Sequence, residues 1–322
     1  MALALAAFSV GRYPISPGQL WTVLWAKLSG APTGLPAAME AVVFRVRGPR
    51  VLAAMAIGAT LAAAGSAYQG LFRNPLVSPD ILGVSTGAAL GATIGIYLSW
   101  GVAGIQGLAF ALGLAAVAAV YAVGASLRRH DPILVLVLAG IVIGTLLGSC
   151  ISLLKYLADP YNQLPAITFW MLGSLASITA GDVASILPAV LIGLVPLWLV
   201  RWRMNVMTLG EDGARTLGVD MRRMRAVVIT AATLMTAAAV SVSGVIGWIG
   251  LLIPHVARLL VGPDFSKLLP AAMLLGAGYL AAVDTLARTL APIEIPLGVL
   301  TALIGAPFFI WLLAVSRRGW QS

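Results

Sequence analysis

The sequence predicts an all-α polytopic membrane protein with about ten membrane-spanning helices. Of its 322 residues, 60% are hydrophobic and only 10% are charged, whereas soluble domains carry about 25% charged residues. The mean hydropathy is +1.00, and apolar runs recur at lengths that fit the hydrocarbon core of a bilayer. In such a chain a net charge of +9 marks membrane loops. A lipid bilayer is therefore expected as a partner, and nucleic acid is not.

The first apolar run, residues 1–10, would rise only about 15 Å as a helix. We expect it to be the second half of a truncated first span, and it lacks the basic leader region of a signal peptide. The other predicted spans are residues 51–71, 81–99, 102–126, 133–154, 183–200, 226–243, 245–261, 270–287 and 297–315. The stretch 245–261 contains glycines, a proline and a histidine, so it could be a broken helix buried among others.

Residues 164–178 form a shorter apolar run between polar residues, which is typical of an interfacial or re-entrant helix. With ten spans and both termini in the cytoplasm, thirteen of the basic residues fall inside and seven outside. This orientation agrees with the positive-inside rule, and the opposite one would violate it. The outside arginines are exceptions to that rule and therefore candidates for function.

Three of these outer arginines are Arg47 and Arg50, which share a helix face, and Arg288, which follows Asp284 by four residues. An ion pair between Asp284 and Arg288 along one helix is expected. Guanidinium groups grip carboxylates through two parallel hydrogen bonds. The three arginines could therefore hold acidic residues of a partner, or they could only extend to the lipid headgroups.

The longest polar stretch, residues 201–225, holds six arginines and three acids and predicts a cytoplasmic loop. Its acids precede Ala-Arg-Thr-Leu, as at a helix start, and Gly218 suits a helix end. We expect two short helices joined at a glycine, within a single transmembrane domain that covers residues 1–322. A solvated positive loop without further function is the alternative.

Polar breaks and small residues organise the spans. Asn74-Pro75 and Ser78-Pro79 end a helix, and Gly87 and Gly91 form a face for close helix approach. Intramembrane polar groups are few, and no cluster of histidine, cysteine or carboxylate has metal-ligand spacing, so no metal site is expected. The chain has one cysteine and no disulfide framework.

Three segments resemble the permease subunits of ABC importers that take up iron chelates and vitamin B12. The pattern Q-x-x-x-R-N-P-L-x-x-P-x-x-L-G-V-x-x-G-A runs from Gln69 to Ala88, and G-L-x-x-P-H-x-x-R runs from Gly250 to Arg258. Residues 294–311 are similar to the last span of that family. The matching blocks cover residues 45–92, 204–219 and 244–312, while residues 100–165 match in hydropathy only.

The resemblance implies the type II ABC importer permease fold and assigns roles to residues. Arginines at the places of Arg47, Arg50 and Arg288 would receive a periplasmic binding protein. The residues that would contact the ATPase subunit as a coupling helix are Gly210, Glu211, Ala214, Arg215, Leu217 and Gly218. A low-affinity translocation path would pass Gln69, Ser149 and Leu153, with the helix at 164–178 close by.

The resemblance further implies a homodimer, two ATP-binding subunits and one binding protein in the inner membrane of a bacterium. The chain has no Gly-x-x-x-x-Gly-Lys-Ser/Thr loop. ATP and Mg²⁺ would therefore act on the partner, and the chain itself would be neither an enzyme nor the holder of a cofactor.

The expected cargo is an iron chelate, either haem or a ferric siderophore, with a corrinoid or an oxyanion such as molybdate as alternatives. A secondary transporter would need ionisable residues at mid-bilayer, which are nearly absent from this sequence. A membrane-embedded enzyme would need a constellation of reactive groups, and none is found.

Overall fold

The computed structural model describes residues 2–11, 13–30, 32–126 and 132–316. Over these ranges the chain is helical and forms no β-strand. A π-helix, η1 (Val42–Arg47), and a 3₁₀-helix, η2 (Pro79–Leu82), interrupt the α-helices. The α-helices are α1 (Ala2–Ser9), α2 (Pro17–Ser29), α3 (Ala37–Ala41), α4 (Gly48–Phe72), α5 (Val84–Tyr97), α6 (Val102–Ser126), α7 (Pro132–Leu157), α8 (Gln163–Leu172), α9 (Ala180–Leu199), α10 (Arg201–Met207), α11 (Gly210–Thr216), α12 (Met221–Ser243), α13 (Ile249–Val261), α14 (Phe265–Ala287) and α15 (Leu297–Ser316).

Six helical stretches of the described chain are long and apolar enough to cross a membrane, and they include α4, α6, α7, α9, α12 and α14. The apolar helices α5, α13 and α15 are shorter. Each of the ten predicted apolar runs contains a helix. The fold class is therefore confirmed as an all-helical membrane protein, while the count of ten crossings stays a prediction.

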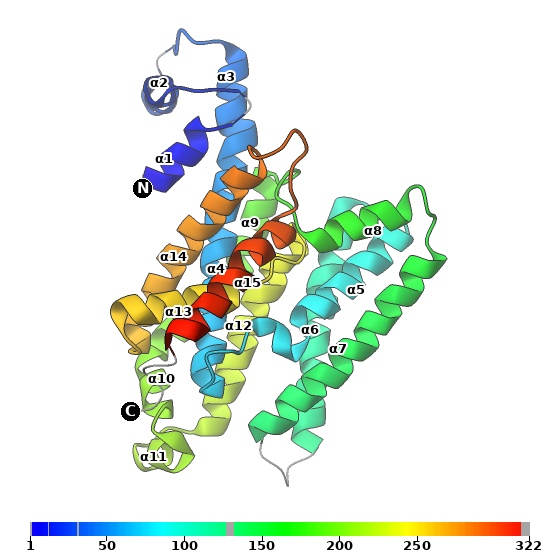
Figure 1. Cartoon of the computed structure of the whole chain (residues 1–322), viewed down its shortest axis with the longest axis vertical. Helices are drawn as coiled ribbons and strands as arrows, with labels where there is room; N and C mark the ends of the chain where they lie inside the picture. The colour runs from blue at the N-terminus through cyan, green and yellow to red at the C-terminus, as the bar shows by residue number, and fades with distance from the viewer. Residues whose placement is uncertain (1, 12, 31, 127–131, 317–322) are drawn as a thin grey trace.

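The helix α4 runs through the middle of the bundle, with α12, α13 and α14 packed around it (Figure 1). This central position requires small residues. A Cβ atom added at Gly58 would overlap with the Gly276 carbonyl of α14, and one added at Gly65 would overlap with Gly250 of α13. Lipid tails are as apolar as leucine, so close backbone approach of this kind is what drives helix association in a membrane.

The predicted small-residue face on α5 is confirmed. Gly87 lies against the Leu112 carbonyl of α6, and Gly91 lies against the Leu108 carbonyl of the same helix. The spacing of four residues places both glycines on one side of α5. This pair therefore has a packing role.

The predicted break between α4 and α5 is also confirmed. Arg73 ends α4 in the left-handed region, with φ 48°, and the Asn74 side chain accepts a hydrogen bond from the Leu76 N–H (2.9 Å). The turn of η2 follows, and Gly83 at φ 77° leads into α5. Proline at the start of η2 fits because the first turn of a helix needs no N–H donor.

Two irregular segments meet inside the bundle. The predicted helix at 164–178 ends at Leu172, and α13 begins only after a non-helical stretch at residues 244–248. The Ser174 N–H donates to the Ser243 carbonyl (2.8 Å), and the Leu297 N–H donates to the Gly173 carbonyl (2.9 Å). The N–H and C=O groups that lose their helical partners at one break thus form hydrogen bonds with another segment. Non-helical backbone at membrane depth requires such bonds, because no water is available there.

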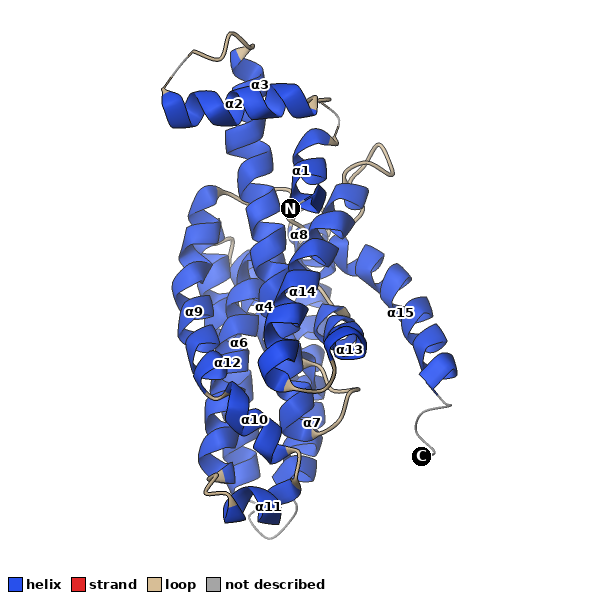
Figure 2. Ribbon diagram, turned by 90° about the vertical axis from the view of Figure 1, so that its left-hand side faces the viewer, coloured by secondary structure: helices blue, strands red, loops and turns tan. Residues whose placement is uncertain are grey.

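The two ends of the bundle carry different elements. Figure 2 shows α2 and α3 at one end, beyond the start of α4, and α11 at the opposite end. The arginines predicted for docking lie toward the first end, and the predicted coupling residues lie at the second. The fold therefore separates the two candidate sites along its long axis.

Candidate functional site

A buried ion-pair cluster lies at the α2 end of the bundle, centred on Arg50 of α4. Its Nε donates to Asp284 Oδ1 of α14 (2.9 Å), and its Nη1 and Nη2 donate to the two carboxylate oxygens of Glu294 (2.8 and 3.0 Å). One guanidinium therefore joins α4 to α14 and to the segment before α15. The bidentate contact with Glu294 fixes the geometry as well as the charge.

Two further arginines complete this cluster. Arg47 donates to the backbone carbonyls of Phe8 and Tyr13, and Arg288 donates to the Ala7 carbonyl (2.7 Å). The predicted ion pair along α14 is present, with Arg288 Nε 3.4 Å from Asp284 Oδ2. The cluster thus ties α1 and the start of α4 to the end of α14.

The structure brings Arg47, Arg50 and Arg288 together, as the docking prediction requires, but turns them inward. Their exposed fractions are 4%, 6% and 8%, and each guanidinium is bonded within the chain. This differs from the expectation of side chains that wait for a partner's carboxylates. The physical reason is that Asp284 and Glu294 already neutralise Arg50, and Asp284 lies beside Arg288, whereas Arg47 is held by backbone carbonyls.

The local backbone explains which arginine is buried. The wide turns of η1 replace α-helical turns just before α4, and π-helical turns are typical of functional sites. Within this π-helix Arg45 is exposed, whereas Arg47 is buried. Of the arginines in this segment, Arg45 is the one that faces outward.

At the opposite end, α10 and α11 form the predicted pair of short helices, hereafter the coupling hairpin. They are joined by Thr208 and Leu209, and Gly210 opens α11 with φ +92°. Gly218 follows α11 with φ +75°, as expected for a glycine that ends a helix. Both glycines adopt a backbone conformation that costs an L-residue about 1–2 kcal/mol.

Some side chains of the coupling hairpin are buried against the bundle, and others are exposed. Ala214 is fully buried, and its carbonyl accepts from the Val219 N–H (2.9 Å). Leu217 is 59% exposed. The Glu211 side chain lies outside the described part of the chain. The contact role predicted for Glu211, Arg215 and the rest of this set stays a prediction.

A hydrogen-bonded link that sequence reasoning missed holds the hairpin to α14. Asn205 of α10 donates from Nδ2 to Asp264 Oδ1 (2.6 Å), and its Oδ1 accepts from the Phe265 N–H (2.7 Å). The hydrogen bond from Asn205, together with the Ser266 N–H, holds the pKa of the Asp264 carboxyl below its usual value. A depressed pKa means that this link is present above the ordinary carboxyl pKa and is lost only as the pH falls through the lower folded value.

The predicted path residues lie in different surroundings. Gln69 is buried, where its Nε2 donates to the Leu251 carbonyl (3.0 Å) and its Oε1 accepts from Arg258 (3.0 Å). Ser149 donates to the Thr145 carbonyl within α7, and Leu153 is 58% exposed on the same helix. The structure does not bring Gln69 together with the α7 pair. In the described residues no group of three or more histidine, cysteine or acidic side chains is placed to hold a metal ion.

One of these long-range contacts had a partial signal in the sequence, and the other had none. Glu294 lies beside the predicted span 297–315, where an acid can cap a helix or pair with a cation, but nothing in the spacing assigns Arg50 as its partner, 244 residues away. Asn205 and Asp264 belong to unremarkable polar positions beside apolar runs. Partners so far apart in the chain can be identified only from the packed structure, because the sequence does not show which helices are neighbours.

A bundle of closely packed apolar helices, with a buried charge cluster at one end and a short helical hairpin at the other, is the architecture of a multi-pass membrane protein. The chain belongs to the FecCD transport family, whose profile matches residues 1–315. This confirms the predicted resemblance to the permeases of iron-chelate and vitamin B12 importers.

Relatives and a solved structure agree with this membership. The chain is 38% identical over 316 residues to the molybdate import system permease protein MolB of Haemophilus influenzae, covering 98% of this chain and 93% of that protein. It is 42% identical over 301 residues to the cobalamin import system permease protein BtuC of Halobacterium salinarum, covering 93% and 80%. A metal-chelate type ABC transporter in an inward-facing conformation superposes with a TM-score of 0.87 at 37% identity, over 97% of this chain and 95% of that one.

Other relatives carry iron-related names. A probable iron chelatin transport system permease protein of Helicobacter pylori is 38% identical over 87% of this chain and 84% of its own length. The hemin transport system permease protein HmuU of Yersinia pestis is 38% identical over 98% of this chain and 93% of its own length. The chain is therefore an ABC importer permease, a transport component of a family whose members carry chemically different cargoes.

Proposed function

We propose that this chain is the membrane subunit of a bacterial ATP-driven importer that moves an iron chelate, haem or a ferric siderophore, across the inner membrane. Family membership over residues 1–315 carries this proposal. The iron-chelate and hemin permeases among its relatives, and the metal-chelate type transporter that it superposes on, support the choice of cargo.

In this proposal the coupling hairpin faces the cytoplasm and seats on one of two ATP-binding subunits. The exposed Leu217 and the glycine-bounded shape of α11 support such a contact. Asn205 would pass the movement of the hairpin to α14, because it holds the first residues of that helix. Rigid-body displacement of packed helices is a common way for a bound motor to open a path.

The binding protein would dock at the α2 end, on the periplasmic side. Because Arg47, Arg50 and Arg288 are bonded internally, we propose that they hold the docking surface in shape. The exposed Arg45 is placed to meet a carboxylate of the partner directly. Both chain termini would then lie in the cytoplasm if all ten apolar runs cross the membrane.

A homodimer would enclose the path beside α7. This helix exposes most of its apolar surface, because only 22% of its apolar 18-residue stretch is buried inside the chain. Ser149 and Leu153 lie on it, so the predicted path residues would face the dimer axis or the lipid.

Two other cargoes are supported by particular relatives. The 42% identity to a cobalamin permease favours a corrinoid, and the 38% identity to a molybdate permease favours an oxyanion. A secondary transporter is a weaker alternative. The buried Asp284 could serve coupling to protons or sodium, but it is already paired with Arg50 and Arg288.

Transport by the reconstituted complex tests the proposal. The chain would be co-purified with its ATP-binding subunit, placed in proteoliposomes and supplied with binding protein loaded with haem, a ferric siderophore, cobalamin or molybdate. We expect uptake of an iron chelate that needs both ATP and the binding protein. Uptake of cobalamin or molybdate instead would overturn the cargo, and uptake without ATP would overturn the importer.

A further inference from the structure

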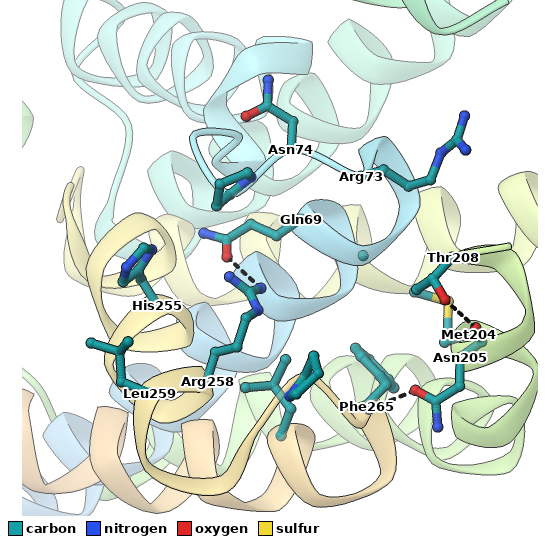
Figure 3. A pocket seen from close by; sticks show the side chains of 14 residues that line it. Gln69, Arg73, Asn74, Met204, Asn205, Thr208, His255, Arg258, Leu259 and Phe265 are labelled. Atoms are coloured by element: carbon teal, nitrogen blue, oxygen red, sulfur yellow. Dashed lines mark hydrogen bonds between the residues drawn. The ribbon is translucent and has the colours of Figure 1, made fainter. Parts of the chain in front are cut away.

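A cavity of ≈ 420 Å³ lies at the α11 end of the bundle, where α4 ends, α13 ends and α14 begins (Figure 3). The hairpin helix α10 closes it on one side through Asn205. Figure 3 shows Arg258 reaching from α13 to Gln69, with His255 on the same helix, and Arg73 leaving the end of α4 on the side of Thr208. Gln69, which was predicted for the path, and Asn205 of the hairpin both line it, but no role given above places a ligand in its open volume.

The charge of the cavity is one-sided. Arg73 and Arg258 line it with positive charge, His255 adds an imidazole, and no acidic side chain belongs to its lining among the described residues. The nearest acid on α14, Asp264, is engaged by Asn205 Nδ2 and by the Ser266 N–H. An anion that enters the cavity would therefore meet positive charge without an internal carboxylate in competition.

Hydrogen-bond donors remain available there. Arg258 donates from Nη2 to Gln69 Oε1, and a guanidinium has five N–H donors. The Nδ1 atom of His255 is buried and has no hydrogen-bond partner among the described residues. A buried polar atom without a partner is costly unless a ligand or water satisfies it.

Helix dipoles alone do not explain this arrangement. Arg73 caps the C-terminal end of α4, and Arg258 lies in the last turn of α13, where positive charge is favourable. However, the terminal carbonyls of α4 already accept from the backbone N–H groups of Arg73 and Asn74. The dipoles account for the sign of the charge, but not for the open volume or for the unpartnered His255 nitrogen.

The remaining surroundings are apolar. Met204, Leu259 and Phe265 line the cavity. Leu259 and the next residue in the chain, Leu260, are 67% and 68% exposed at the end of a membrane helix. A phosphate group with acyl chains attached would satisfy both halves of the site, because basic pockets between membrane helices bind anionic headgroups.

We propose that this cavity binds the phosphate of an anionic phospholipid such as phosphatidylglycerol. Arg73, His255 and Arg258 hold the phosphate, and the acyl chains lie on Leu259 and Leu260. The lipid thereby contacts α4, α13 and the coupling hairpin at once. The assignment needs only the position of the cavity at an end of the bundle, so it stands apart from the cargo and from the sidedness proposed above.

Native mass spectrometry of the purified full-length chain tests the lipid site. Phosphatidylglycerol and phosphatidylcholine with the same acyl chains would be titrated against the wild type and against Arg73→Gln and His255→Gln, with Arg222→Gln as the control. Arg222 is an exposed arginine at the same end, outside the cavity. We expect preferential phosphatidylglycerol binding, weakened about tenfold by either cavity variant, which is the loss of one charge-assisted hydrogen bond, and unchanged in the control.

Inorganic phosphate in competition distinguishes the two sources of the anion. If phosphate alone binds and phosphatidylglycerol shows no preference over phosphatidylcholine, the lipid assignment is wrong. Equal lipid binding by the wild type, Arg73→Gln and His255→Gln would overturn the site itself. The exposed Arg73 and the unpartnered His255 are chosen because Arg258 bonds to Gln69 and its loss could disturb folding.

Discussion

At the scale of single residues, Arg50 shows how burial changes the role of a charge. In water an arginine on a helix would contribute little to stability, but Arg50 lies between Asp284 and Glu294 with an exposed fraction of 6%. A buried ion pair is not strongly stabilising compared with apolar residues, yet removal of one partner leaves an uncompensated charge. The cluster therefore specifies how α4 and α14 meet.

The variant Arg50→Gln should destabilise the protein by about 3 kcal/mol, toward the lower end of the range for a broken buried pair. Arg288 remains 3.4 Å from Asp284 and offsets part of the loss. The melting temperature in detergent measures the effect. The control Arg45→Gln changes an exposed arginine five residues earlier in the chain and should leave the melting temperature unchanged. Equal melting of the two variants would show that the cluster has no structural role.

At the scale of helices, the glycines of α4 decide how closely its neighbours approach. Gly58 and Gly65 lie seven residues apart, on one face of the helix, and face Gly276 of α14 and Gly250 of α13. Each contact is backbone against backbone, so no side chain can move to make room. The central position of α4 depends on these contacts.

The variant Gly65→Ala should cost at least about 1–3 kcal/mol, as is usual for an overpacked core. Thermal unfolding of the purified protein measures it. Gly107→Ala in α6 is the matched control, because nothing lies within 4 Å of an added Cβ there. It should be neutral or stabilise by about 0.5–1 kcal/mol, because alanine is the better helix former. If Gly65→Ala left the stability unchanged, the backbones of α4 and α13 would not be in close contact at Gly65 and Gly250.

The link between the hairpin and α14 is also an element-scale feature. The variant Asn205→Ala removes both hydrogen bonds that hold α10 to the start of α14. We expect ATP hydrolysis by the reconstituted importer to persist while uptake per ATP falls, because the hairpin then moves without α14. Asn162→Ala, in the exposed connection before α8, is the control. If both variants transport like the wild type, Asn205 does not transmit the movement.

At the scale of the whole molecule, the structure places two unlike surfaces at opposite ends of one bundle. The α2 end is tied together by buried charges, and the α11 end carries the coupling hairpin and the basic cavity. An importer that contacts its ATP-binding subunits on one side of the membrane and its binding protein on the other needs this separation. The sidedness of the two ends is therefore central to the proposed function.

Cysteine labelling measures that sidedness. In a Cys150→Ala background, Ser29→Cys at the α2 end should react with a membrane-impermeant maleimide in intact spheroplasts. Arg222→Cys, beyond the hairpin, should react only after permeabilisation. Both positions are exposed in the structure, so access decides the outcome. The reverse pattern would place the coupling hairpin outside and contradict an intracellular motor.

Much of this architecture could be predicted without coordinates. Apolar length located a helix in every predicted run, Asn74-Pro75 marked the end of α4, and Gly218 marked the end of α11. These are local properties, because hydropathy, proline and positive φ act within a few residues. The bond between Arg50 and Glu294 could not be predicted, because that carboxylate is 244 residues away in the chain, and the docking role of Arg47, Arg50 and Arg288 stays a prediction.

By itself the sequence determined that the chain folds into a bundle of membrane helices, where they break, and which family it belongs to. These follow from composition, spacing and motif. The tertiary structure alone decided that the three arginines turn inward, that Asn205 ties the hairpin to α14, and that Arg73, His255 and Arg258 share one cavity. Each of these depends on helices distant in sequence coming into contact, as α4 does with α14 and α13 through the backbone packing at Gly58 and Gly65.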